Sequence, residues 1–257
     1  MKPRILIYDI ETSPLVSYTW GIWEQNVIKV IQDWQILCFA YQWYGESKIH
    51  FIAQWQYKSY KPGVYKLDDK NVVIELWKLF NEADVIIAHN GNSFDQKKSQ
   101  ARMIAHKLPP PAPYKQLDTK IIAKRVGAFT SNKLDDLGAL IGGGHKEETG
   151  GFKLWEQCME GDRKAQRKME KYNRMDVKRL EELYTGLRPW VTNHPAMNID
   201  PVERDKCPKC GVVGKMQSRG FLHRKINKVR RYQCMSCGGW SQARKPEPVK
   251  EYPDYVN

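Results

Sequence analysis

Short apolar runs alternate with amphipathic stretches along the first half of the chain. Residues 4–10 form an apolar run that predicts a buried strand, and two runs rich in aromatic and branched residues, 34–44 and 48–53, predict further strands in an antiparallel meander. A helical repeat of apolar positions predicts a helix over 71–82, and the apolar run 84–88 predicts the strand that this helix covers. The pattern indicates a domain in which helices cover a sheet.

The alternation continues to a long C-terminal helix of this domain. Further helices are expected at 94–107, 119–126, 133–141 and 162–184, with a short strand around Leu117 and a glycine-rich mobile loop over 142–151. Prolines at 189, 195 and 201 then interrupt every regular pattern. We therefore expect a domain over 1–187, a linker over 188–205 and a small module over 206–257.

Length and composition agree with this division. The chain has 257 residues, of which 41% are hydrophobic and 28% charged, so it can bury a core and is not disordered throughout. The best uninterrupted apolar run, residues 5–8, stops at Asp9, far short of the about 20 residues that a membrane helix needs. The N-terminus also lacks the apolar stretch of a signal peptide. We expect a soluble, cytoplasmic protein with no membrane partner.

Positive charge is concentrated near the C-terminus. The formal net charge is +13, and residues 206–245 contain 11 basic residues and no acidic one. Aromatic side chains at Phe221, Tyr232 and Trp240 lie among these cations and offer stacking surfaces. The pattern favours binding of nucleic acid, a polyanion. A solvated basic tail is the alternative.

Four cysteines in the same region form two CxxC pairs separated by 23 residues. They are Cys207, Cys210, Cys234 and Cys237, and a glycine follows each pair. In a chain that is not exported, this spacing indicates a metal site and not disulfides. Four thiolates complete a tetrahedral Zn²⁺ shell. The module resembles a zinc ribbon with strands over 220–223 and 229–233, and its single Zn²⁺ is expected to be structural.

Acidic residues occur at three places in the predicted fold where a functional site could form. Asp9 and Glu11 share one face at the end of a strand, and their mutual repulsion favours a divalent cation between them. Asp95 follows the strand 84–88, and Tyr172 stacks with Asp176 on one helix face. Each feature alone has an ordinary structural explanation: surface acids, a carboxylate at a helix N-terminus, or a buried tyrosine beside a paired aspartate.

Taken together, the three features resemble a known family. Asp9-Ile10-Glu11, the segment from Asn90 to Asp95, and the Tyr172…Asp176 pair match the DxE, NxxxFD and YxxxD motifs of DEDD exonucleases, in the tyrosine subtype DEDDy. Residues 1–187 are similar to the 3′–5′ proofreading exonuclease domains of family B DNA polymerases and to related stand-alone nucleases often found in bacteriophages. The resemblance implies an α/β fold with an RNase H-like mixed sheet flanked by helices, here followed by the small four-cysteine zinc ribbon.

The resemblance also implies roles for individual residues. Asp9, Glu11 and Asp176 would hold one Mg²⁺ or Mn²⁺, and Asp9 would bridge to a second ion supported by Asp95. Tyr172 would orient the attacking water. Two further residues, Asn90 and Phe94, would help to bind the terminal nucleotide. The implied activity is two-metal-ion hydrolysis of DNA from its 3′ end to nucleoside 5′-monophosphates.

The sequence is compatible with several other functions. A structure-selective endonuclease or a ribonuclease on the same fold, or a non-catalytic nucleic-acid-binding protein, would share much of this sequence pattern. DNA is favoured over RNA as the partner, replication or repair proteins are candidate partners, and the compartment is the host cytoplasm if the protein is phage-encoded. The tryptophans at 20, 23 and 34 form either core or a base-stacking surface, and we expect core.

Overall fold

The computed structural model describes residues 3–23, 26–141, 150–198 and 205–248. The chain divides into two compact units, one of which is Arg4–Leu183 and the other Tyr184–Asn257 together with Met1–Pro3. No helix among the described residues is both long enough and apolar enough to span a membrane.

A five-stranded mixed sheet forms the centre of the first unit. Its strands, in the spatial order β5-β4-β1-β6-β7, are β5 (His50–Ala53), β4 (Ile36–Trp43), β1 (Ile5–Thr12), β6 (Val85–Ala88) and β7 (Lys115–Asp118). Strand β1 runs antiparallel to β4 and parallel to β6, so it lies in the middle of the sheet. Its nearly continuous apolar sequence fits a strand that is covered on both faces.

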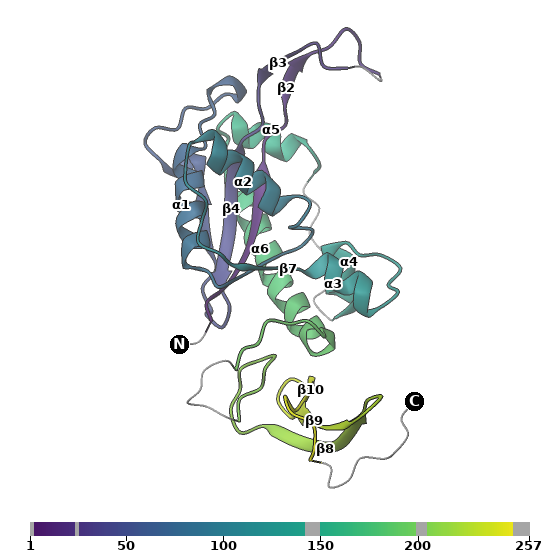
Figure 1. The fold of residues 1–257 in the computed structure, drawn as a ribbon. Helices are drawn as coiled ribbons and strands as arrows, with labels where there is room; N and C mark the ends of the chain where they lie inside the picture. Colours follow the sequence, from purple (N-terminus) through teal and green to yellow (C-terminus); the bar gives the residue numbers. More distant parts are fainter. Residues whose placement is uncertain (1–2, 24–25, 142–149, 199–204, 249–257) are drawn as a thin grey trace. The chain divides into compact units, whose positions relative to one another are not determined.

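Helices flank this sheet (Figure 1). They are α1 (Lys70–Glu82), α2 (Asp95–Ala105), α3 (Thr119–Val126), α4 (Leu134–Leu140), α5 (Lys153–Met159) and α6 (Arg163–Leu187), with short 3₁₀ turns at η1 (Gln54–Gln56) and η2 (Val64–Lys66). The core under α1 contains Leu6, Tyr8 and Ile10 from β1. The predicted α/β fold, a mixed sheet flanked by helices, is therefore confirmed.

Asp69 fixes the start of α1 to its neighbours. Its fully buried carboxylate accepts a hydrogen bond from the Ile36 backbone N–H at 2.9 Å. Arg102 of α2 contacts both carboxylate oxygens at 2.7 Å, and His106 Nε2 lies 2.6 Å from Oδ1. This network joins α1, α2 and β4 in the interior, because a buried carboxylate needs charged or hydrogen-bonded partners.

The sequence did not predict a hairpin between β1 and β4. Its strands are β2 (Val16–Tyr18) and β3 (Lys29–Gln32), and among the described residues they pair only with each other. Trp20 is 88% exposed and Trp23 78% exposed, so the expectation that they belong to the core was wrong. Trp34, by contrast, is partly buried against the core. The difference arises because the five-stranded sheet ends before the hairpin (Figure 1).

The second unit begins with the end of α6 and a 3₁₀ turn, η3 (Arg188–Trp190). Its sheet has the order β10-β9-β8, formed by β8 (Met216–His223), β9 (Lys228–Cys234) and β10 (Trp240–Gln242), all antiparallel. The strands β8 and β9 are longer than predicted, and β10 was not predicted. Most of the glycine-rich segment predicted as a mobile loop lies outside the described residues.

Candidate metal centres

Strand β1 places Asp9 and Glu11 on the same face of the sheet. Side chains alternate along a strand, and the core under α1 takes the even-numbered residues 6, 8 and 10. The two acids therefore project from the opposite face. They pair with Ala40 and Cys38 of β4, and the last pair in the ladder between β1 and β6 is Ile7 with Ile87. The carboxylates thus lie just beyond the part of β1 that is hydrogen-bonded to both β4 and β6.

Helix α6 brings a third carboxylate to this face. Asp176 is buried, and one carboxylate oxygen from each of Asp9, Glu11 and Asp176 lies within 4.8 Å of the others. Three carboxylates at this spacing repel one another unless positive charge or protons intervene. Carboxylate oxygens are the ligands that Mg²⁺ and Mn²⁺ prefer, so the donor set fits such a cation.

Asn173 supports Asp9 from the same helix. Its Nδ2 donates to Asp9 Oδ2 at 2.7 Å and to the Asp9 backbone carbonyl at 3.3 Å, and the residue is fully buried. Because Asn173 stands three positions before Asp176, both side chains lie on one side of α6. From the sequence alone, Asn173 had no expected role. Its position between Tyr172 and Asp176, on the same side of the helix as Asp176, could have indicated such a role.

Trp155 reaches Glu11 from helix α5. Its indole Nε1–H donates to Glu11 Oε2 at 3.1 Å. The Trp155 ring also meets the Tyr172 ring edge-to-face, with centroids 6.1 Å apart and an interplanar angle of 72°. No motif or periodicity indicated Trp155, since α5 itself was not predicted.

Tyr172 lies against the three carboxylates. Burial raises its pKa above the usual range, and the charges of Asp176, Glu11 and Asp9 raise it further. The phenol therefore keeps its proton at neutral pH and can act as a hydrogen-bond donor. It stands one helical turn before Asp176, as the sequence spacing required.

Asp95 occupies a different position from the other three acids. It is only 3% exposed and begins α2, and its Oδ1 accepts a hydrogen bond from the Ile10 backbone N–H at 3.2 Å. It is not a member of the group within 4.8 Å. Burial raises its pKa to about 7, the charge of Asp118 adds to this effect, and the Ile10 hydrogen bond opposes it. Asp95 is thus adjacent to the cluster through the β1 backbone.

The turn before Asp95 is organised by Asp118. The Asp118 carboxylate accepts hydrogen bonds from the backbone N–H groups of Asn90 at 3.0 Å and Asn92 at 3.1 Å, and it also caps α3. Asn90 has a positive φ of 66°. A Cβ at Gly91 would stand 2.6 Å from the Ala88 Cβ, so this turn needs glycine there. Asp118 is therefore a structural acid that shapes the loop carrying Asn90.

Two neighbours of this turn have distinct surroundings. The His89 ring nitrogens lie 2.9 Å from Thr119 Oγ1 and 2.9 Å from the Asn132 carbonyl oxygen, which fits a structural role. Phe94 is 38% exposed. Lys98 Nζ lies 5.1 Å from the Phe94 ring centroid and 3.7 Å from that of Trp34. The Lys98 cation therefore lies close to two aromatic rings near the start of α2.

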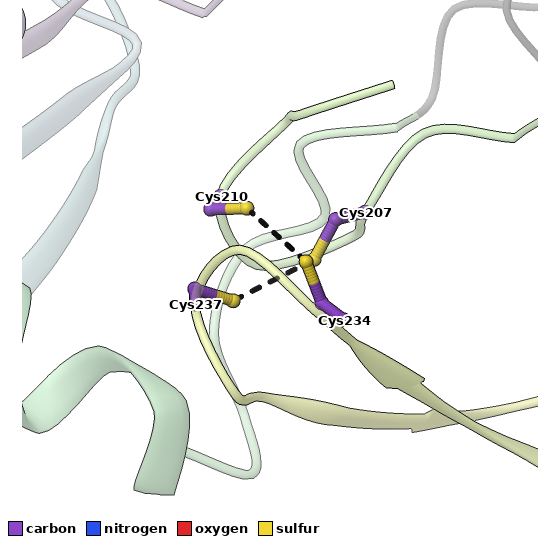
Figure 2. A group of neighbouring side chains, drawn as sticks. All are labelled: Cys207, Cys210, Cys234 and Cys237. Atoms are coloured by element: carbon purple, nitrogen blue, oxygen red, sulfur yellow. Dashed lines mark hydrogen bonds between the residues drawn. The ribbon is translucent and has the colours of Figure 1, made fainter. Parts of the chain in front are cut away.

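The second unit contains a cluster of four cysteines (Figure 2). The Sγ atoms lie within 4.8 Å of one another, with 3.9 Å between Cys207 and Cys237 and 3.8 Å between Cys210 and Cys234. These distances exclude disulfides, which need about 2 Å. A tetrahedral Zn²⁺ with bonds of about 2.3 Å would place its sulfurs about 3.8 Å apart. The cluster is compatible with a zinc site.

Backbone turns shape this cluster. Gly211 and Gly238 both have φ of 73°, and their N–H groups donate to the carbonyls of Cys207 and Cys234 at 2.9 Å. A left-handed glycine after each CxxC pair lets the chain fold back around the sulfurs. Burial raises the pKa of the Cys207 thiol, so several thiolates would not coexist here without a cation.

Comparison with known proteins relates this chain to a protein family and to a solved structure. A family model described as the RNase H superfamily matches residues 6–188. A solved structure of the family B DNA polymerase from the hyperthermophilic archaeon Pyrobaculum calidifontis is similar with a TM-score of 0.50 and 15% sequence identity. That match covers 73% of this chain and 25% of the polymerase, so the chain spans about a quarter of the polymerase's length. Among curated proteins there is no match.

Proposed function

The chain belongs to the RNase H superfamily, and we propose that it is a metal-dependent 3′–5′ exonuclease that hydrolyses DNA to nucleoside 5′-monophosphates. The observation that carries this proposal is the meeting of Asp9, Glu11 and Asp176 within 4.8 Å, beside Tyr172. Membership of the RNase H superfamily supports nuclease activity in general. The three acids together with the tyrosine favour an exonuclease of the DEDDy subtype.

Each residue then has a chemical task. Asp9, Glu11 and Asp176 would bind a divalent cation, with Asp9 and Asp95 contributing to a second. Two such cations, Mg²⁺ or Mn²⁺, neutralise the attacking and leaving oxygens of an in-line displacement at phosphorus. Water adds to the phosphorus of the last phosphodiester, the bond to the 3′ oxygen breaks, and that oxygen leaves as the new terminal 3′ hydroxyl.

Tyr172 and the loop before α2 would position the reactants. Tyr172 keeps its proton, because burial and the neighbouring charges raise its pKa, so its hydroxyl can donate a hydrogen bond that orients the attacking water. Phe94 is exposed enough to pack against a terminal nucleotide, and Asn90 shares its turn. Lys98, next to both Phe94 and Trp34, offers a positive charge for phosphate.

The four-cysteine module, residues 206–248 of the second unit, would assist substrate binding. In β9, Lys228 and Arg230 both lie 4.8 Å from the Phe221 ring centroid, and Arg231 lies 5.5 Å from that of Trp240. Cations interleaved with aromatic rings suit a flexible polyanion with bases that stack. A structural Zn²⁺ on the four cysteines would hold this small sheet together, because a unit of this size has little core of its own.

A cleavage assay tests the proposal. A 5′-labelled single-stranded DNA and its RNA counterpart would be incubated with Mg²⁺ or Mn²⁺ and the wild type, Asp9→Ala or Asp176→Ala. Glu75→Ala is the matched control, since Glu75 is an acid on α1 that pairs with Lys78. We expect a metal-dependent ladder of 3′-shortened DNA with the wild type and the control, and none with the two site variants.

Other outcomes identify the competing functions. Internal cutting of a DNA with both 3′ ends blocked would indicate an endonuclease, and faster hydrolysis of the RNA would indicate a ribonuclease. If the wild type binds nucleic acid tightly but cleaves neither polymer with either metal, the exonuclease proposal is wrong and a binding protein is the better description.

A further inference from the structure

The two acids of β1 are each held by a neutral N–H group. Asn173 Nδ2 donates to Asp9 Oδ2 at 2.7 Å, and Trp155 Nε1 donates to Glu11 Oε2 at 3.1 Å. A lysine or arginine in either place would cancel the carboxylate charge. A neutral donor fixes the orientation of the carboxylate and preserves its negative charge for a cation.

Trp155 also makes a second contact within the site. Its ring meets the edge of the Tyr172 ring, with the centroids 6.1 Å apart. One rigid side chain therefore contacts both a proposed metal ligand and the proposed water-orienting phenol. An indole has only two side-chain torsions, so fixing it also limits the positions of Glu11 and Tyr172.

Helix α5 is firmly anchored behind Trp155. Leu154, Cys158 and Met159 are buried in the core. The carbonyl of Cys158 accepts hydrogen bonds from the Tyr60 hydroxyl and from Gln166 Nε2, each at 3.2 Å, and the carbonyl of Met159 accepts one from the Gly63 N–H at 2.8 Å. The last turn of this short helix is therefore satisfied from outside the helix. Trp155 projects from a fixed support.

We infer that Trp155 is a positioning residue: it orients Glu11 through its indole N–H and Tyr172 through its ring, so that the site is arranged before cation and substrate bind. This inference rests on the proposed function for the role of Tyr172, whereas its effect on cation binding depends only on the carboxylate cluster. No motif in the sequence assigns Trp155 this task.

The principal test measures Mn²⁺ binding without substrate. Isothermal titration would compare the wild type with Trp155→Phe, which keeps an aromatic ring and removes the N–H. Trp77→Phe is the matched control, because the Trp77 indole of α1 also donates a hydrogen bond, at 2.8 Å to the Pro109 carbonyl. We expect Mn²⁺ affinity to fall about 10–100-fold in Trp155→Phe, as for other residues that orient metal ligands. The control should bind like the wild type.

Kinetics add a second measure. Because Trp155 does not have to touch DNA in order to act, kcat should fall about tenfold or more in Trp155→Phe with little change in KM. Equal Mn²⁺ affinity and equal kcat in Trp155→Phe and the wild type would overturn the inference. If the wild type cleaves no nucleic acid but Trp155→Phe still weakens Mn²⁺ binding, the proposed nuclease function fails and the positioning of Glu11 stands.

A spectroscopic measurement keeps the inference testable if Trp155→Phe does not fold. The nine tryptophans give separate indole N–H signals in a ¹⁵N-labelled sample. Substoichiometric Mn²⁺ should broaden one of them first, and that signal should be the one missing from Trp155→Tyr. If the first signals to broaden all persist in Trp155→Tyr, Trp155 does not lie beside the cation and the inference is wrong.

Discussion

Asn173 of α6 donates its side-chain amide to Asp9 of β1 over 2.7 Å, although 164 positions separate the two residues in the sequence. Asn173 is fully buried, and its Oδ1 has no hydrogen-bond partner among the residues that the structure describes. An unsatisfied buried oxygen costs about 1–3 kcal/mol. The useful contact of this amide is therefore the hydrogen bond from its nitrogen, which fixes Asp9 where β1 and α6 meet.

Asn173→Ala should consequently weaken both the fold and cation binding. Hydrogen bonds to charged groups contribute about 1.5–3 kcal/mol, and loss of the orphaned oxygen offsets part of that amount. We expect the free energy of unfolding, measured with urea, to fall by about 1–2 kcal/mol, and Mn²⁺ affinity to fall about tenfold. Asn71→Ala is the control, since the Asn71 side chain bonds Ser59 near the surface. Unchanged Mn²⁺ affinity would show that Asn173 has a purely structural role.

Asp95 should make stability depend on pH when no divalent cation is added. Its folded-state pKa is raised from 3.8 to about 7, mainly by burial. Well below pH 3.8 both the folded and the unfolded state are protonated, and the stabilising effect of Asp95 is complete. As pH rises from about 4 to 7, the unfolded state loses the proton first, so stability decreases by up to about 4 kcal/mol. Melting temperatures between pH 4 and pH 8 should fall more steeply for the wild type than for Asp95→Asn. Parallel curves would contradict this.

Trp20 should contribute to substrate binding without contributing to stability. It is 88% exposed on the hairpin that follows β1, and exposed indoles stack on bases. We expect Trp20→Ala to weaken binding of single-stranded DNA by about 1–3 kcal/mol, with an unchanged melting temperature. Fluorescence anisotropy with a labelled oligonucleotide measures the first effect. A lower melting temperature with unaltered DNA binding would indicate instead that the hairpin is structural.

Lys228 should contribute to the salt dependence of DNA binding. It is exposed in β9, close to Phe221, and each phosphate contact adds about 0.9 to the slope of log K against log salt concentration for duplex DNA, or about 0.7 for single strands. Lys228→Gln should lower that slope by this amount and leave kcat at saturating DNA unchanged. Lys78→Gln, which removes a cation paired with Glu75 on α1, should not change the slope. If both variants alter the slope equally, the four-cysteine module has no special part in binding.

Removal of metal from the cysteine cluster should unfold the second unit. Four sulfurs within 4.8 Å surround little apolar core, so Cys207→Ser or a strong zinc chelator should expose β8 and β9 to protease. Limited proteolysis with mass spectrometry would map the cuts, which we expect after position 205 and not within Arg4–Leu183. One equivalent of zinc should be released on chelation. Protection that persists after complete removal of zinc would disprove the structural role.

Several features of this protein could be predicted from the sequence because they depend on near neighbours. The apolar run of β1, the helical repeat of α1 and the sheet flanked by helices were all evident, and element ends differed from the predicted ones by a few residues. The two-residue spacing of Asp9 and Glu11 fixes them on one strand face, and the four-residue spacing of Tyr172 and Asp176 fixes them on one helix face. The CxxC pairs likewise indicated a cluster of four sulfurs.

Other features were decided only by the tertiary structure. Trp155 and Asn173 meet Glu11 and Asp9 across more than a hundred residues of sequence, and no local pattern records such a contact. Apolar side chains of the β2–β3 hairpin resemble core residues in sequence, yet Trp20 is exposed because β2 and β3 form a separate two-stranded sheet outside the five-stranded one. Local periodicity states which face a side chain occupies, whereas the partner on that face depends on how the sheet and helices pack around it.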